Sequence, residues 1–283
     1  MNKISINMPQ MDFCGLSENW LLKKAGNYHW QEIFEKANLK SKNLVNDYGK
    51  RMYPAFIAIK CKYNSPLNKV KENDNINLKI NLKQYGNVFF NSNITFYNKK
   101  ISLKLEMLTA FVVRENEYFN DFIKEKSNFF HNFESLRHPP KLLNINKKIR
   151  IKKINRYKLS GYLFKKKSVN GKKKMDFPPS PYTDFNGARM LYFAAYPTIS
   201  DIVTRNIVNK EKVFNLKKDW ALLTSTIKRD IFYYGNLNLG DKLTVVINDI
   251  NKKKTKIFIH TILLNKSNKE IIAEIFTVKQ LIN

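Results

Sequence analysis

The stretch MPQMDFCGLSENWLLKKAGNYHW, residues 8–30, decides how this chain is interpreted, and a shorter echo, TDFNGARMLYFAAYPTISD, occupies residues 183–201. Both contain Asp-Phe-x-Gly, at 12–15 and at 184–187, and in both a run of aromatic and apolar residues follows. The two motifs lie 172 residues apart at every matched position. A repeat with this spacing predicts two similar domains in one chain.

Each copy predicts a turn that leads into a buried helix. Gly15 and Gly187 would let backbone N–H groups approach a ligand closely. The helix start would offer free N–H donors and a positive dipole end to an anionic or carbonyl oxygen. Asn186 could hold a thioester carbonyl or a carboxylate through its amide, or it could make an Asx turn. The alternative for each copy is an ordinary junction whose aspartate caps the helix, but the duplication favours Gly15, Asn186 and Gly187 as groups that bind an anionic or carbonyl oxygen.

Two other residues of the first copy carry reactive groups. His29 is a candidate member of the same oxygen-binding group because of its place in the stretch, although a histidine that packs or hydrogen-bonds is the simpler interpretation. Cys14 precedes a helix start that would lower the pKa of its thiol. No base accompanies it in the sequence, which favours a small buried apolar residue.

Composition narrows the class of protein. The chain has 283 residues with 43% hydrophobic and 13% aromatic content, which suits two globular domains. It lacks the run of about 18 apolar residues that a membrane helix needs and begins with no signal peptide. Cys14 and Cys61 make no disulfide framework, so we expect a reducing cytoplasm. The net charge of +28 could indicate nucleic acid, an anionic cofactor or an acidic partner, but abundant Lys, Asn and Ile throughout also suit a compositional bias with solvated lysines.

The hydrophobic pattern predicts the same order of elements in both halves. The first half has a helix over 17–38 with Ser17 as its N-cap, broken into two pieces at Gly26 and Asn27. The second half has a helix over 188–209, interrupted near Tyr196-Pro197. Strands are expected at 53–63, 76–85, 88–97 and 101–114, and again at 220–233, 242–250, 255–264 and 270–280. A helix wrapped by an antiparallel sheet, twice, predicts an α+β double hot-dog fold.

The region between the halves has a weaker pattern. It predicts a short helix within 119–136, a loosely alternating strand over 149–164 and a lysine- and proline-rich connector near 140–181. We therefore place an N-terminal hot-dog domain at 1–145 and a C-terminal one at 146–283.

Catalytic motifs of the standard hydrolases and nucleotide-binding enzymes are missing, and the four histidines lack metal-ligand spacing, so no metal site is predicted. His131 and His138 fall in the connector and His260 in a strand, where structural roles suffice. Tyr53 begins the first strand after the helix and follows Arg51. In a hot-dog unit that strand end lies near the helix start, so the phenol could donate a hydrogen bond to an acyl group or carry it. A packing tyrosine is the alternative.

Several segments resemble the LnmK-like family of biosynthetic hot-dog proteins. They are MPQM (8–11), GLSENWL (15–21), GNYHW (26–30), DFNG (184–187), LYF (191–193), RDIFYYGN (229–236) and IAE (272–274). The likeness spans both halves and leaves out the connector. It implies an acyltransferase/decarboxylase of polyketide assembly that takes a methylmalonyl-type acyl group from acyl-CoA to an acyl carrier protein. It also implies Tyr53 as the catalytic residue, with the coenzyme A thioester as substrate and no further cofactor.

Two other functions remain open from the residues. A thioesterase for acyl-CoA or acyl carrier protein would need a carboxylate opposite the helix start, and Glu18, Asp12 and Asp184 are available. A non-catalytic basic module for nucleic acid is the weakest of the three, because no cluster of arginine and aromatic residues supports it. Since two fused units already supply the pair that single units obtain by dimerising, a monomer and a homodimer are equally expected.

Overall fold

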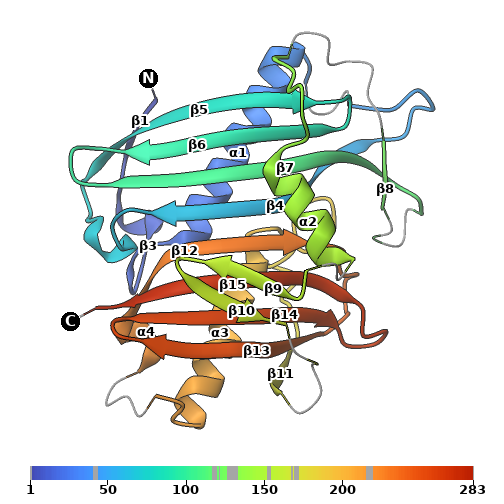
Figure 1. Cartoon of the computed structure of the whole chain (residues 1–283). Helices are drawn as coiled ribbons and strands as arrows, with labels where there is room; N and C mark the ends of the chain where they lie inside the picture. Colours follow the sequence, from blue (N-terminus) through green and yellow to red (C-terminus); the bar gives the residue numbers. More distant parts are fainter. Residues whose placement is uncertain are drawn as a thin grey trace.

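One antiparallel sheet runs through the whole chain in the computed structural model, which describes residues 2–40, 44–116, 120, 122–125, 133–151, 154–166, 168, 172–214 and 219–282. Its spatial order is β1 (Asn2–Ser5), β5 (Asn75–Tyr85), β6 (Phe89–Tyr97), β7 (Ser102–Arg114), β4 (Met52–Tyr63), β12 (Thr224–Tyr233), β15 (Ile271–Leu281), β14 (Lys256–Asn265), β13 (Leu243–Lys253) and β11 (Lys173–Phe177), with β8 (Phe122–Lys124) paired to β7 (Figure 1). The halves join where β4 pairs with β12, from Lys62 opposite Lys228 to Ala58 opposite Phe232.

The long strands lie within a few residues of their predicted positions, because local alternation and turn residues define them. The main difference is at 220–233, where a short helix, α4 (Trp220–Leu223), precedes β12. A small hairpin of β2 (Met11–Asp12) and β3 (Gly15–Leu16) precedes the first long helix.

Helix α1 (Glu18–Ala37) is continuous, so the predicted break at Gly26 is wrong. Ser17 caps it as expected, its hydroxyl accepting a bond from the Trp20 amide at 3.4 Å. A Cβ at Gly26 would lie 2.6 Å from Cζ of Phe193. Glycine is therefore needed for close packing rather than for ending the helix.

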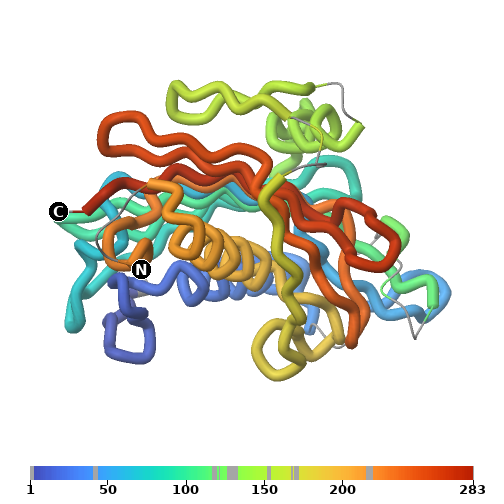
Figure 2. Tube along the Cα trace, turned by 90° about the horizontal axis from the view of Figure 1, so that it is seen from below, coloured from blue at the N-terminus to red at the C-terminus, as the bar shows by residue number. Residues whose placement is uncertain are grey.

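Helix α3 (Ala195–Lys210) starts seven residues later than predicted and has no interruption at Pro197. Proline occupies the first turn, where its missing N–H removes no intrahelical bond. Both helices lie along the same face of the sheet (Figure 2), and their apolar residues form the largest core cluster with that face.

The predicted connector is folded, and it covers the opposite face of the sheet (Figures 1 and 2). It contains α2 (Lys141–Arg150) and a hairpin of β9 (Arg156–Leu159) and β10 (Tyr162–Lys165), so the single strand predicted over 149–164 is wrong. Leu142, Leu143 and Phe164 are buried against sheet residues. Hydrogen bonds from Tyr157 to Asp230 and from Tyr162 to Asp249 fasten the hairpin.

Two predictions about this region are only partly addressed. The boundary at 145/146 falls inside α2 and stays a prediction. The short helix expected within 119–136 lies largely outside the described residues, as does His131, and the described part contains strand β8. Among the described residues, no helix is both long and apolar enough to cross a membrane.

Candidate functional site

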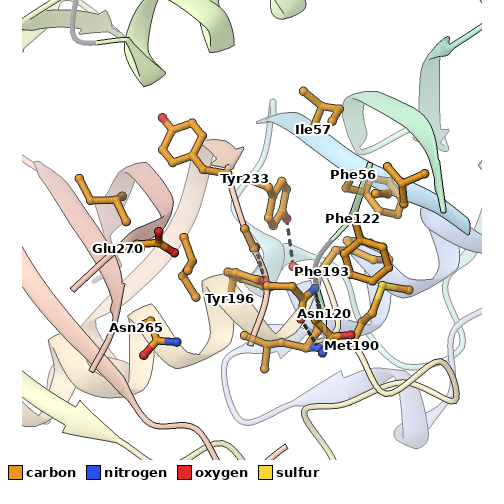
Figure 3. Close-up of a pocket in the computed structure, with 18 of the residues that line it drawn as sticks. Phe56, Ile57, Asn120, Phe122, Met190, Phe193, Tyr196, Tyr233, Asn265 and Glu270 are labelled. Carbon is orange, nitrogen blue, oxygen red and sulfur yellow. Dashed lines mark hydrogen bonds between the residues drawn. The ribbon is translucent and has the colours of Figure 1, made fainter. Parts of the chain in front are cut away.

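A cavity of about 770 Å³ opens where β4 and β12 part. Their ladder ends at Ala58 opposite Phe232; beyond it β4 continues with β7 and β12 with β15. The opening therefore lies between the halves, with Phe56 and Ile57 on one side and Tyr233 on the other (Figure 3). We call this space the junction cleft.

The lining divides into chemical groups. The apolar and aromatic group includes Trp30, Phe56, Phe122, Met190, Phe193, Tyr196 and Tyr233. The amide group is Asn120, Asn146, Asn186, Asn236, Asn238, Asn265 and Asn268, and the charged group is Glu115, Lys124, Arg150, Lys166, Glu270 and Glu274. Such a cleft can bury an apolar chain beside polar groups that orient it.

A second cavity of about 530 Å³ adjoins the junction cleft, since Trp30, Asn186, Tyr192 and Phe193 line both. Tyr53 and Gly187 also line this second cavity. The structure thus brings Tyr53 together with Asn186 and Gly187, which follow it by more than 130 residues in the chain.

Tyr53 is partly buried beneath two guanidinium groups. Those of Arg51 and Arg114 lie 5.7 and 5.6 Å from its ring centroid, and Phe122 packs edge-on at 6.5 Å. Both cations face the ring, so they hold its position and place positive charge at this end of the cavity.

Asn186 makes the Asx turn that the sequence left open. Its Oδ1 accepts bonds from the amides of Ala188 at 2.9 Å and Met190 at 3.1 Å. Arg114 ties this loop to the first half by donating to the carbonyl of Ala188 at 2.5 Å, and Asn120 donates to the carbonyl of Arg189 at 2.9 Å. The Oδ1 atom is thus used structurally, which leaves the amide nitrogen as the group that could donate to a ligand.

The inner wall is built from aromatic rings. Phe56 and Phe193 stack with centroids 3.9 Å apart, across the boundary between the halves. The hydroxyl of Tyr233 donates to the carbonyl of Phe193 at 3.0 Å, and that of Tyr196 to the carbonyl of Gly235 at 3.0 Å. Burial raises the pKa of both phenols, so they act as neutral donors.

A buried ionic group adjoins the cleft on the connector side. Glu274, 1% exposed, accepts from Lys166 at 2.5 Å and lies 3.0 Å from Nε2 of His260. Burial opposes ionisation of Glu274, but the bonds from His260 and Lys166 outweigh it and lower the pKa of the carboxyl. Glu274 is therefore a charged anchor for Lys166.

Two predicted site residues, Gly15 and His29, line neither cavity. Gly15 has φ +116° and packs so closely on Asn68 that a Cβ would lie 2.4 Å from its Cα. His29 is fully buried, 2.7 Å from Ser92 Oγ and 2.8 Å from Thr109 Oγ1, and burial lowers its pKa to about 3. His29 has the packing and hydrogen-bonding role that was its alternative interpretation. Gly15 is needed for close packing, and the helix after it is capped by Ser17 rather than by Asp12.

The two Asp-Phe-x-Gly motifs also differ in their relation to the helices. Helix α1 begins three residues after Gly15, whereas α3 begins eight residues after Gly187. Gly187 therefore lies in the loop at the cavity, and the helix start reaches the cleft through Tyr196 instead. Helix α3 has no side-chain N-cap, so its positive end is not covered by a side chain of its own.

The carboxylates proposed for a thioesterase are occupied elsewhere. Glu18 pairs with Arg229, Asp12 accepts from the Cys14 amide at 2.8 Å, and Asp184 accepts from the Ser180 amide at 2.7 Å. Burial raises the pKa of the Cys14 thiol, which favours the inert interpretation. In the described ranges, no three His, Cys, Asp or Glu side chains are grouped as for a metal ion.

Sequence reasoning missed most of the lining. Trp30, Phe193, Tyr233 and Glu274 all lie in segments that carry the family resemblance, so their presence there was the available signal. The cations of the connector, Arg150 and Lys166, had no such signal, because nothing local shows that this segment folds over the cleft.

The sequence matches no protein-family model and no curated protein. Solved structures do resemble the whole chain. A protein described as an oleoyl thioesterase from Lactobacillus plantarum has a TM-score of 0.70 at 9% identity, covering 99% of this chain and 94% of its own. The 12:0-ACP thioesterase from Umbellularia californica has a TM-score of 0.65 at 8% identity, covering 99% and 93%.

An acyl-ACP thioesterase from Bacteroides thetaiotaomicron has a TM-score of 0.58 at 10% identity, covering 99% and 96%. At such identities the likeness concerns the fold alone. The LnmK-like resemblance stays a prediction, since no family match supports it. The predicted α+β double hot-dog fold is confirmed.

Proposed function

We propose that this chain acts on acyl thioesters of coenzyme A or of an acyl carrier protein, with the acyl group bound in the junction cleft. The observation that carries the proposal is the cleft itself, a cavity of about 770 Å³ lined by aromatic, amide and cationic side chains. Its setting in a double hot-dog frame like that of three solved thioesterases supports the same substrate class.

Reaction at a thioester carbonyl creates an oxyanion that needs hydrogen-bond donors or a positive dipole. The amide nitrogen of Asn186 is suited to donate such a bond. The start of α3, which has no side-chain N-cap, adds its positive dipole end beside Tyr196. In this arrangement the α3 end supplies what the sequence assigned to Gly15 and its helix.

Hydrolysis is the reaction we favour, because three structural neighbours that cover 99% of the chain are named as thioesterases. Water adds to the carbonyl carbon, the C–S bond breaks, and the departing thiolate takes up a proton. Glu115 and Glu270 line the cleft from the two halves and are the carboxylates available to orient that water.

Acyl transfer with decarboxylation is a second candidate, favoured by the shared cavity of Tyr53, Asn186 and Gly187. The phenol oxygen of Tyr53 would take the acyl group from the thioester, releasing coenzyme A as a thiol. The carrier's thiol would then accept the acyl group and free the phenol. Loss of carbon dioxide from a malonyl-type group leaves an enolate that Asn186 could stabilise before it is protonated.

Incubation with dodecanoyl-, octanoyl- and methylmalonyl-CoA, with and without holo carrier protein, separates the reactions. Free thiol with an acid of unchanged carbon number identifies hydrolysis, whereas carbon dioxide with acylated carrier identifies the second reaction. Tyr53→Phe should lower carrier acylation by about 100-fold or more if the phenol carries the acyl group, while leaving the melting temperature nearly unchanged. If none of the CoA and carrier-bound thioesters is turned over, the proposed function is wrong.

A further inference from the structure

Cations from three separate segments meet at the connector side of the junction cleft. Lys124 comes from β8, Arg150 from the last turn of α2, and Lys166 from the residue after β10. Lys166 is neutralised by Glu274 at 2.5 Å. Lys124 and Arg150 have no ion-pair partner among the residues that the structure describes.

The two unpaired cations line the same cleft, and Lys147 lies in the same helical turn as Arg150. Partial burial lowers the pKa of Lys124, and the positive charges of Arg150 and Lys147 lower it further. Glu115 and Glu270 also line the cleft, but neither forms an ion pair with Lys124 or Arg150 in the described residues. Like charges held together without a counter-ion favour a bound anion.

A favourable interaction of basic residues with the helix dipole does not by itself explain why Lys124 and Arg150 line the same cavity. Basic residues in the last turn of α2 are favourable for the helix by themselves. Lys124, however, belongs to β8; its ammonium group lies over the Phe89 ring, 5.2 Å from the ring centroid, and the residue lines the same cavity. Convergence from two elements on one cavity is the geometry of a binding site.

We propose that Lys124 and Arg150 hold the phosphate of a phosphopantetheine arm, which places the thioester at its other end in the aromatic part of the junction cleft. This inference rests on the proposed function. Phosphate suits these side chains because a guanidinium can bind it through two hydrogen bonds and an ammonium adds a point charge. The side-chain amide of Asn146 also lines the cleft and suits the polar middle of the arm. Its nitrogen already donates to the Ile57 carbonyl at 2.9 Å, so its oxygen is the group that could accept a hydrogen bond from the arm. The basic connector thereby has a role in substrate binding.

The first test compares octanoyl-pantetheine, which lacks the phosphate, with octanoyl-phosphopantetheine. The wild type should turn over the phosphorylated substrate with a kcat/KM at least about tenfold higher. Lys124→Gln and Arg150→Gln should each reduce that ratio, and the double variant should bring it close to one. Lys148→Gln removes the same charge from the same helical turn without touching the cleft, and it should keep the wild-type ratio.

Octanoyl-CoA and octanoyl-carrier protein distinguish the two sources of the arm. Both carry the phosphate, so the double variant should lower kcat/KM for both, and the natural source is the one with the higher wild-type value. Equal kcat/KM for the pantetheine and phosphopantetheine substrates in the wild type would overturn the inference, as would an equal loss in Lys148→Gln.

Calorimetric binding of pantetheine and phosphopantetheine tests the anion site without turnover. If no thioester reacts but phosphopantetheine still binds more tightly than pantetheine, and the double variant abolishes the difference, the site stands and the proposed function fails. If turnover is observed but the phosphate has no effect on either rate or binding, the function stands and the anion site is wrong.

Discussion

Arg229→Met should destabilise the protein more than any surface substitution, because Arg229 joins the two halves through a buried ionic cluster. Its side chain is 0% exposed and donates to Glu18 of α1 at 2.8 and 3.1 Å and to Asp201 of α3 at 2.8 and 3.3 Å. Thr226 and Thr277 accept further bonds at 3.2 and 3.0 Å. Methionine fills similar space but leaves two carboxylates without their main partner.

The expected loss is about 3–5 kcal/mol, the usual cost of breaking a buried ion pair on one side. That is a large part of the roughly 5–15 kcal/mol by which most domains are stable. The remaining bonds to the two carboxylates reduce this loss of stability only partly. Tyr63 still donates to Glu18 at 3.1 Å, and Lys279 to Asp201 at 3.0 Å.

Urea denaturation at pH 7, followed by circular dichroism, measures the change. Arg205→Met is the matched control, because Arg205 also makes a bidentate ion pair, with Asp219, but its side chain is 50% exposed. Solvent screens that pair, so the control should change the midpoint far less. A loss in Arg229→Met no greater than in the control would refute the reasoning.

The fall of the free energy of unfolding at acid pH, which we call the acid limb, gives a second readout of the same cluster. Burial opposes ionisation of Asp201, but Arg229 and Lys279 outweigh it and lower its pKa to about 2. A carboxyl whose pKa is lowered in the native state stabilises the fold above pH about 4, and this stabilisation is lost as the pH falls towards 2. Arg229→Met should therefore weaken the acid-dependent loss, and an unchanged acid limb would contradict the assignment.

Two further predictions concern single positions. Gly26→Ala should lower the free energy of unfolding by about 0–2 kcal/mol. Alanine gains about 1 kcal/mol in helix propensity, but its Cβ would meet Phe193 at 2.6 Å, an overpacking that costs about 1–3 kcal/mol. A urea titration that shows stabilisation would contradict this contact. Asp230→Asn should remove a decline in stability between pH 4 and 6. Burial raises the pKa of Asp230 to about 6 despite the bond from Tyr157, and a carboxyl with a raised native pKa costs stability as the pH rises through that pKa. Parallel pH profiles of the variant and the wild type would exclude this role of Asp230.

Local sequence predicted those parts of the fold that local physics controls. The strands at 53–63 and 101–114 follow from alternation and flanking turns, and the Ser17 cap follows from its place before an apolar run. Tyr53, Asn186 and Gly187 were named from motif and resemblance, and the structure places all three on one cavity.

Only the tertiary structure decided which sequence motifs serve packing and which line the candidate binding site. Gly26 reads as a helix break until Phe193, from the other half, is seen against it. From the sequence, Glu18 is a candidate thioesterase carboxylate, whereas the fold pairs it with Arg229, 211 residues away in the chain. The lysine-rich connector reads as a linker, although its apolar residues cover the sheet and its cations reach the cleft. In each case the deciding partner lies far away in the chain, and burial and charge pairing depend on distance in space, which no local window of sequence contains.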